Sequence, residues 1–244
     1  MGKSSKRERD EADQMRRLLL IGGTAAAVAA SATTYMVMRQ PMIKTLFGSE
    51  TIKSRLSRVG PTTHHQQLNG SGADLLVISD TGCTYCREFV RNGLDPLIKF
   101  AEENGLSATY LSVGFGRSGF VSTIAGACVE REGSSLSGPD RVRALFQMTG
   151  EGVPDGVAPE QVISDASGLL GTSRLALSRC AQEEALLFRD RFEATRRLFE
   201  LERTPTFFLA DPAAPGRIMK LDGFTSSGAM VRRLERALQT EGEA

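Results

Sequence analysis

The sequence is poor in several residue types that would point to particular functions. It has no tryptophan and only three tyrosines, so a binding platform of aromatic side chains is not expected. Its formal net charge is +1, because 30 Lys and Arg residues balance 29 Asp and Glu residues. This balance gives no electrostatic indication of a nucleic-acid partner or of a strongly acidic substrate. We also find no phosphate-binding loop, hydrolase triad or metal-ligand cluster in it.

Histidine is scarce as well, and its two copies are adjacent, His64 and His65, in a polar stretch. No carboxylate or cysteine lies near them at the spacing of metal ligands. We therefore interpret them as part of a solvated segment and expect no metal site.

The four cysteines are too few for a small domain built on disulfides, but their number is even, as a paired set would be. The 244 residues, 41% of them hydrophobic and 24% charged, can bury a sizeable core. The composition therefore predicts an ordinary globular protein whose cysteines either react with other molecules or form one or two disulfide bonds.

Residues 18–38 form an uncharged run between a charged start and a polar continuation. This length suits a helix that crosses a bilayer, and Arg16 and Arg17 before it favour a cytoplasmic N-terminus. Residues 1–17 would then be cytoplasmic, and the rest of the chain would lie outside the cytoplasm. The alternative is an export signal cleaved after the small residues 30–32. We favour a retained anchor, because the apolar run continues beyond that site.

Residues 39–72 are polar and rich in glycine and proline, so we interpret them as a linker with one short helix near 50–58. A domain is expected to follow over 73–244. Its first part, 73–80, is a short apolar run typical of a buried strand. Residues 83–104 have apolar side chains at helical spacing, and Pro96 is expected to kink that helix.

A second strand is expected at 106–115, which would complete a parallel βαβ unit with the first strand and its helix. A helical insertion over about 117–202 follows, with helices predicted at 120–131, 139–148, 159–169, 173–182 and 184–201. Strands at 204–211 and 217–224 and an amphipathic helix at 226–240 form the last part. The expected fold is α/β, with the insertion between a βαβ half and a ββα half.

The most informative motif is CTYC, in which Cys83 and Cys86 follow the first strand and begin the first helix of the domain. At a helix N-terminus, residues three apart lie on one face, one turn from each other. Unpaired amides and the positive end of the helix would stabilise a Cys83 thiolate. A zinc site would need further cysteines or histidines at close spacing. We therefore favour a redox-active dithiol over a metal site.

Thr204 and Pro205 stand where the strand after the insertion begins. A proline at the start of a strand can have a cis peptide bond, although trans is the more common form. Placed opposite the cysteines, Pro205 would shield the sulfurs, and the backbone of Thr204 could pair with an extended substrate.

These two motifs, VISDTGCTYCREF and TPTFFLAD followed by GRIMKLDGF, resemble the periplasmic disulfide-bond oxidoreductases of the DsbA/DsbC/DsbG group. The resemblance covers about residues 73–241 and implies a thioredoxin-like fold without a cofactor. It assigns Cys83 as the nucleophile, Cys86 as the resolving cysteine, and Thr204 with Pro205 as the cis-proline pair. It also implies exported clients with thiols or disulfides and a membrane redox partner. Together with the uncharged run at 18–38, it predicts a periplasmic domain tethered to the inner membrane, or soluble after signal cleavage.

Within that group, the features of the sequence point in different directions. The dipeptide between the cysteines, Thr84 and Tyr85, is not the Pro-His of the strongest oxidases, so a milder oxidant is expected. Threonine before the proline resembles the isomerase branch, whereas the long insertion resembles DsbA. The function predicted is therefore thiol–disulfide exchange. The alternatives are an isomerase or reductase kept reduced by a membrane donor, and a non-catalytic module that binds metal or clients.

The other two cysteines, Cys128 and Cys180, both fall in helical parts of the insertion. An exported protein folds in an oxidising compartment, which favours a structural disulfide between them. Some exported DsbA-like proteins have a pair at similar places. The alternative is two buried free thiols.

Overall fold

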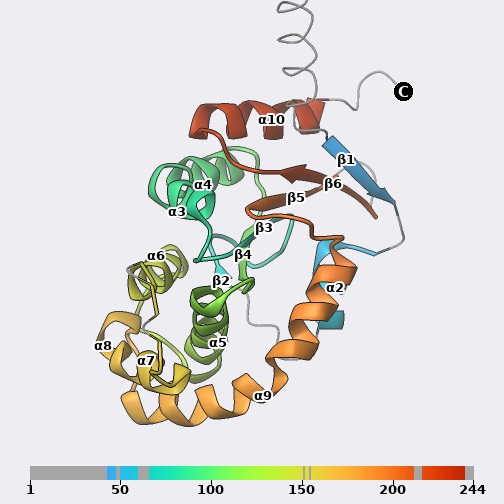
Figure 1. The fold of residues 1–244 in the computed structure, drawn as a ribbon. Helices are drawn as coiled ribbons and strands as arrows, with labels where there is room; N and C mark the ends of the chain where they lie inside the picture. The colour runs from blue at the N-terminus through green and yellow to red at the C-terminus, as the bar shows by residue number, and fades with distance from the viewer. Residues whose placement is uncertain are drawn as a thin grey trace, which may run out of the picture. The chain divides into compact units, whose positions relative to one another are not determined.

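The protein is described by a computed structural model that covers residues 43–47, 50–59, 66–150, 152–153, 155–211 and 216–239. A six-stranded sheet in the order β1-β6-β5-β3-β4-β2 forms its centre. The strands are β1 Ile43–Phe47, β2 Gln66–Gln67, β3 Leu75–Ser79, β4 Ala108–Ser112, β5 Thr206–Ala210 and β6 Arg217–Asp222. Figure 1 shows the sheet with helices on either side and a block of helices below it.

The expected order of elements, βαβ, helices and then ββα, is confirmed. Strands β3 and β4 are parallel, β3 and β5 are antiparallel, and β5 and β6 are antiparallel. Every residue of β3 and β4 is buried, as expected for short apolar strands covered on both faces.

Two helices, α3 (Thr84–Asn92) and α4 (Leu94–Glu103), connect β3 to β4. The prediction of one helix kinked at Pro96 is wrong, because the break falls at Gly93. A Cβ atom there would lie 2.6 Å from the ring of Phe224, so only glycine allows this close approach. Pro96 instead lies in the first turn of α4, where a missing amide costs little.

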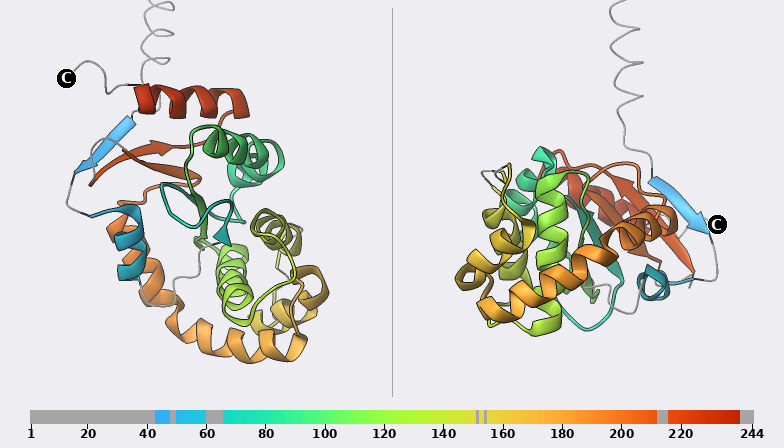
Figure 2. Two further views of the ribbon diagram at one scale, coloured as in Figure 1. Left: turned by 180° about the vertical axis from the view of Figure 1, so that it is seen from behind. Right: turned by 60° about the horizontal axis from the view of Figure 1, so that its bottom comes forward.

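Different helices cover the two faces of the sheet (Figures 1 and 2). On one face α3, α4 and α10 (Ser227–Gln239) pack on apolar side chains that include Val77, Tyr110 and Phe207. On the other face, α2 (Ile52–Val59) and the segment after α9 pack on a second set that includes Leu76 and Phe208.

Residues 39–72 are not simply a linker as predicted, because described parts of this segment belong to the fold. Strand β1 pairs with β6 along its whole length. Helix α2, close to the short helix expected near 50–58, buries Ile52, Leu56 and Val59. These residues are spaced as i, i+4 and i+7, a signal that already indicated a packed helix.

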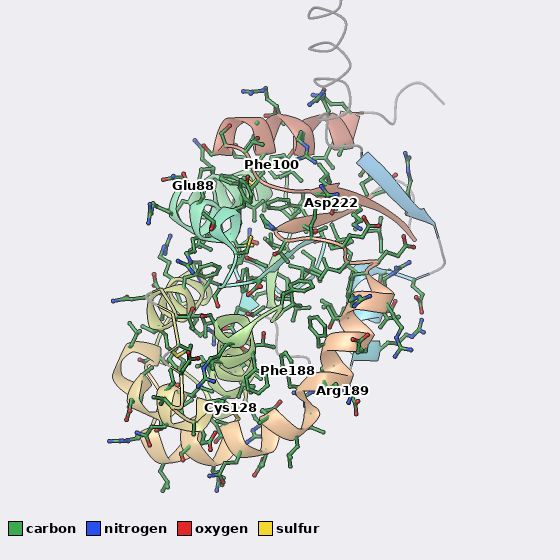
Figure 3. The ribbon with its side chains drawn as sticks, viewed as in Figure 1. Glu88, Phe100, Cys128, Phe188, Arg189 and Asp222 are labelled. Atoms are coloured by element: carbon green, nitrogen blue, oxygen red, sulfur yellow. A yellow bond between two sulfur atoms is a disulfide. The ribbon has the colours of Figure 1, made fainter. Side chains whose placement is uncertain are left out.

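The described residues of the insertion form five helices with a core of their own: α5 Arg117–Glu132, α6 Gly138–Met148, α7 Pro159–Asp165, α8 Ser167–Leu170 and α9 Arg174–Leu198. Cys128 of α5 is joined to Cys180 of α9 by a disulfide bond. Both sulfur-bearing side chains are fully buried in this core, and Figure 3 labels Cys128 there.

Helix α9 is continuous, whereas two helices, at 173–182 and 184–201, were predicted. Glu184, near the expected break, is almost fully buried and its carboxylate accepts from both Arg131 and Arg191. Because this carboxylate is paired on both sides, it can remain buried without interrupting the helix.

No helix among the described residues is long and apolar enough to cross a membrane. The predicted anchor or signal at 18–38, and the charged residues 1–17 before it, lie outside the described residues.

Candidate functional site

Cys83 and Cys86 lie at the carboxyl end of β3, where the chain turns into α3. The Cys83 amide donates to the Asp80 carbonyl at 3.0 Å, which closes the turn after the strand. Cys83 itself is the extended N-cap of α3, with φ −87° and ψ 127°. Cys86 follows one helical turn later, on the side that faces the core.

Cys83 is a free, half-buried thiol with a strongly shifted acidity. Its pKa is lowered from 9.0 to about 6, chiefly because the Cys86 thiol donates a hydrogen bond to the Cys83 sulfur. The amides of Tyr85 and Cys86 and the Thr204 side chain also favour the thiolate, while partial burial opposes it. At neutral pH Cys83 is therefore largely a thiolate, the reactive form in disulfide exchange.

Cys86 is a free thiol with no exposed surface. Burial strongly raises its pKa, and the hydrogen bond to Cys83 raises it further. The Asp80 amide donates to its sulfur at 3.5 Å. The two thiols thus differ as an attacking and a resolving cysteine would: one is accessible and ionised, the other is shielded and protonated.

The segment before β5 lies against this dithiol. Antiparallel pairing of Ile78 with Thr206 places the residues before Thr206 beside those that follow β3. The Thr204–Pro205 peptide bond is cis, and Cys83 in its protonated form donates to the Thr204 carbonyl, 3.4 Å from its sulfur. Within the described residues, nothing accepts a hydrogen bond from the Thr204 amide.

Asp80 connects this site to the loop after β4. Its buried carboxylate accepts from the Gly82 amide at 2.9 Å and from the Phe115 amide at 3.3 Å. Burial raises its pKa. A Cβ at Gly119 would lie 2.2 Å from this carboxylate, so glycine is required there. No local sequence pattern indicates this contact between Asp80 and the loop after β4, so the sequence alone did not predict it.

The part of the chain that the structure describes contains no cluster of three or more histidine, cysteine, aspartate or glutamate side chains able to hold a metal ion. His64 and His65 lie outside the described residues.

The acidity of Cys83 predicts how the reduced protein reacts with iodoacetamide. Its alkylation rate should rise as the pH increases through about 6, whereas a free cysteine does so near 8.5. Thr204→Val should move the midpoint upward, because it removes a hydroxyl that favours the thiolate. The pKa of Cys83 is lower in the folded protein than in the unfolded chain, so ionisation of this thiol also stabilises the reduced fold. This stabilisation is fully present above the unfolded pKa and is lost as the pH falls through about 6. A wild-type midpoint near 8.5 would contradict this assignment.

Comparisons with known proteins agree with this geometry. No family model and no curated protein sequence matches the chain. Among solved structures, the catalytic domain of Proteus mirabilis ScsC is 17% identical, with a TM-score of 0.50 over 78% of this chain and 99% of that chain. A variant of Wolbachia pipientis alpha-DsbA1 is 14% identical, with a TM-score of 0.52 over 72% and 92%. Reduced DsbA from Mycobacterium tuberculosis is 15% identical, with a TM-score of 0.50 over 71% and 91%.

At these identities the likeness establishes the fold. The domain has a DsbA-like thioredoxin fold with a helical insertion. What it does follows from the chemistry of its own site.

Proposed function

We propose that the protein is a thiol–disulfide oxidoreductase that exchanges disulfides with other proteins through Cys83 and Cys86. The observation that carries this proposal is the pair of free thiols whose pKa values shift in opposite directions at the start of α3. The Thr204–Pro205 segment against the Cys83 sulfur supports it.

In the reducing direction, the Cys83 thiolate attacks a client disulfide, and one client sulfur leaves. Cys86 then attacks the Cys83 sulfur in the mixed disulfide and releases the second client sulfur. In the oxidising direction, a client thiolate attacks the Cys83–Cys86 disulfide and Cys86 leaves. The Thr204 amide, which donates to none of the described residues, offers the backbone of an extended client a hydrogen bond beside the reacting sulfur.

A stabilised Cys83 thiolate favours the reduced form of the pair, which makes the disulfide a better oxidant. Much of this stabilisation comes from Cys86 and local amides rather than from a nearby positive charge. An oxidase of moderate strength fits both this site and the Thr84-Tyr85 dipeptide. An isomerase or reductase kept reduced by a membrane donor is the alternative.

Redox titration of the purified protein in glutathione buffers tests this function. We expect a reversible two-electron transition between dithiol and Cys83–Cys86 disulfide, measured by mass after thiol alkylation. Cys83→Ala and Cys86→Ala should each abolish the transition. Tight stoichiometric zinc binding without such a transition would instead favour a metal-binding module.

We also propose that residues 18–38 anchor the protein in the inner membrane, with the domain in the periplasm and exported proteins as clients. The buried Cys128–Cys180 disulfide supports an oxidising compartment. Full-length protein should then remain in the membrane pellet after an alkaline carbonate wash. A mature N-terminus near Thr33 in the soluble fraction would support the cleaved signal instead.

A further inference from the structure

The last residue of β3, Ser79, has a hydroxyl group with no evident structural use. Ser79 has no exposed surface, and its Oγ makes no hydrogen bond of ordinary geometry with any described residue. The same holds for the hydroxyl of Tyr110, which is also fully buried. Buried hydroxyls are normally hydrogen-bonded, and an unpaired one destabilises the fold, so an exception requires an explanation.

The hydroxyls of Ser79 and Tyr110 both lie close to the buried thiol of Cys86. Ser79 is on the same face of β3 as Val77, which packs in one cluster with Cys86 and Tyr110. The next residue, Asp80, donates its amide to the Cys86 sulfur. The Ser79 hydroxyl lies beside Cys86 on one side and beside Tyr110 on the other. Val77 and Tyr110 are partners in the β3–β4 register.

Disulfide exchange at this site creates a negative charge on the sulfur of Cys86, which water cannot reach because the residue has no exposed surface. Whether the Cys83–Cys86 bond forms or breaks, Cys86 passes through a thiolate. A buried thiolate without donors is strongly unfavourable. The Asp80 amide provides one long hydrogen bond, at 3.5 Å, and the Thr204 side chain also favours the thiolate from the side of Cys83.

We propose that Ser79 is a catalytic residue that donates a hydrogen bond to the Cys86 thiolate, with Tyr110 positioning it from behind. The inference rests on the proposed function and adds a residue to its mechanism. A serine hydroxyl rotates freely, so it can turn toward the sulfur when the charge develops. Such a donor, fixed on a rigid strand, lowers the barrier because little reorganisation is needed.

Ser79 transfers no proton in this step. When Cys86 resolves a mixed disulfide, its proton goes to solvent, its sulfur bonds to the Cys83 sulfur, and the bond from Cys83 to the client sulfur breaks. The departing client thiolate carries the electron pair of that bond and takes up a proton from solvent. The dithiol is oxidised, and the client disulfide is reduced.

Stopped-flow reaction of the reduced protein with an aromatic disulfide that releases a coloured thiolate separates the two steps. The first release reports attack by Cys83, and the second reports attack by Cys86. Ser79→Ala should leave the first rate near that of the wild type and slow the second by roughly ten- to a hundredfold, as loss of a hydrogen bond to a charged group would. Ser79→Thr, which keeps the hydroxyl, should restore most of the second rate.

Ser122→Ala is the matched control, because Ser122 is also a fully buried serine, and its hydroxyl donates to the Gly119 carbonyl and accepts from Thr81. It should change neither rate. Tyr110→Phe should slow the second release less than Ser79→Ala does. A second release from Ser79→Ala as fast as that from Ser122→Ala, or equal slowing of both releases, would overturn the inference. A wild-type protein that releases only one thiolate would instead refute the proposed function itself.

Discussion

Replacing Cys86 with alanine is expected to convert the protein into a trap for its clients. Cys83 would still be a thiolate able to attack a disulfide, but nothing could resolve the resulting mixed disulfide. Adducts of high mass should accumulate in cells and disappear on treatment with a reductant, as seen on non-reducing gels. Turnover should fall to background, since each molecule can react only once.

Cys83→Ala should lose activity equally but trap little, because the remaining thiol of Cys86 is fully buried and protonated. The double variant, Cys83→Ala with Cys86→Ala, sets the background. Stronger trapping by Cys83→Ala than by Cys86→Ala would reverse the assigned roles. The binding-module alternative would gain if neither variant formed adducts and the wild type bound metal tightly.

The site could be located from the sequence because its parts are local patterns joined by simple strand pairing. The CTYC motif stands between a buried strand and a helix, and Thr204-Pro205 precedes another strand. Pairing of Ile78 with Thr206 is enough to bring the two motifs together. The difference in burial between Cys83 and Cys86 follows from their places one turn apart on a helix whose inner face packs on the sheet.

Other parts of the site depend on contacts between distant loops, which no local pattern contains. The Asp80 carboxylate accepts from the Phe115 amide, and glycine is needed at 119 because that carboxylate and the backbone of Gly114 lie against it. The role proposed for Ser79 likewise depends on the absence of a hydrogen bond from its hydroxyl to any described residue, which only a three-dimensional arrangement can show.

The errors in the fold have equally physical causes. Strand β1 forms by pairing with β6, almost 180 residues later in the chain. Its own sequence has no local pattern that predicts a strand and therefore resembles a linker. Helix α9 runs through the break predicted between 182 and 184, because Glu184 is buried there between two arginines that pair with its carboxylate. In both cases tertiary partners override what the local sequence favours.

Removal of the Cys128–Cys180 disulfide is expected to have the largest effect on stability. The bond joins α5 to α9 across a sequence separation of 52 residues. Closing a loop of about that length restricts the unfolded chain enough to stabilise the fold by about 4 kcal/mol. The double variant Cys128→Ala with Cys180→Ala should therefore unfold at a clearly lower urea concentration, and mass mapping of non-reduced wild-type peptides should link the two cysteines.

Exchange activity should survive this change, because the disulfide lies in the core of the insertion, whereas Cys86 packs in the cluster beneath α3. Wild-type protein reduced at both cysteine pairs is the matched control. It keeps the two buried sulfur-bearing side chains but not the cross-link, so its unfolding midpoint separates loss of the bond from loss of packing. If the double variant lost exchange activity with its unfolding midpoint unchanged, Cys128 and Cys180 would have to be a second redox pair that passes electrons to or from Cys83 and Cys86. A lower urea midpoint with both rates of the aromatic-disulfide reaction unchanged would instead establish that the Cys128–Cys180 disulfide stabilises the insertion and takes no part in exchange at Cys83 and Cys86.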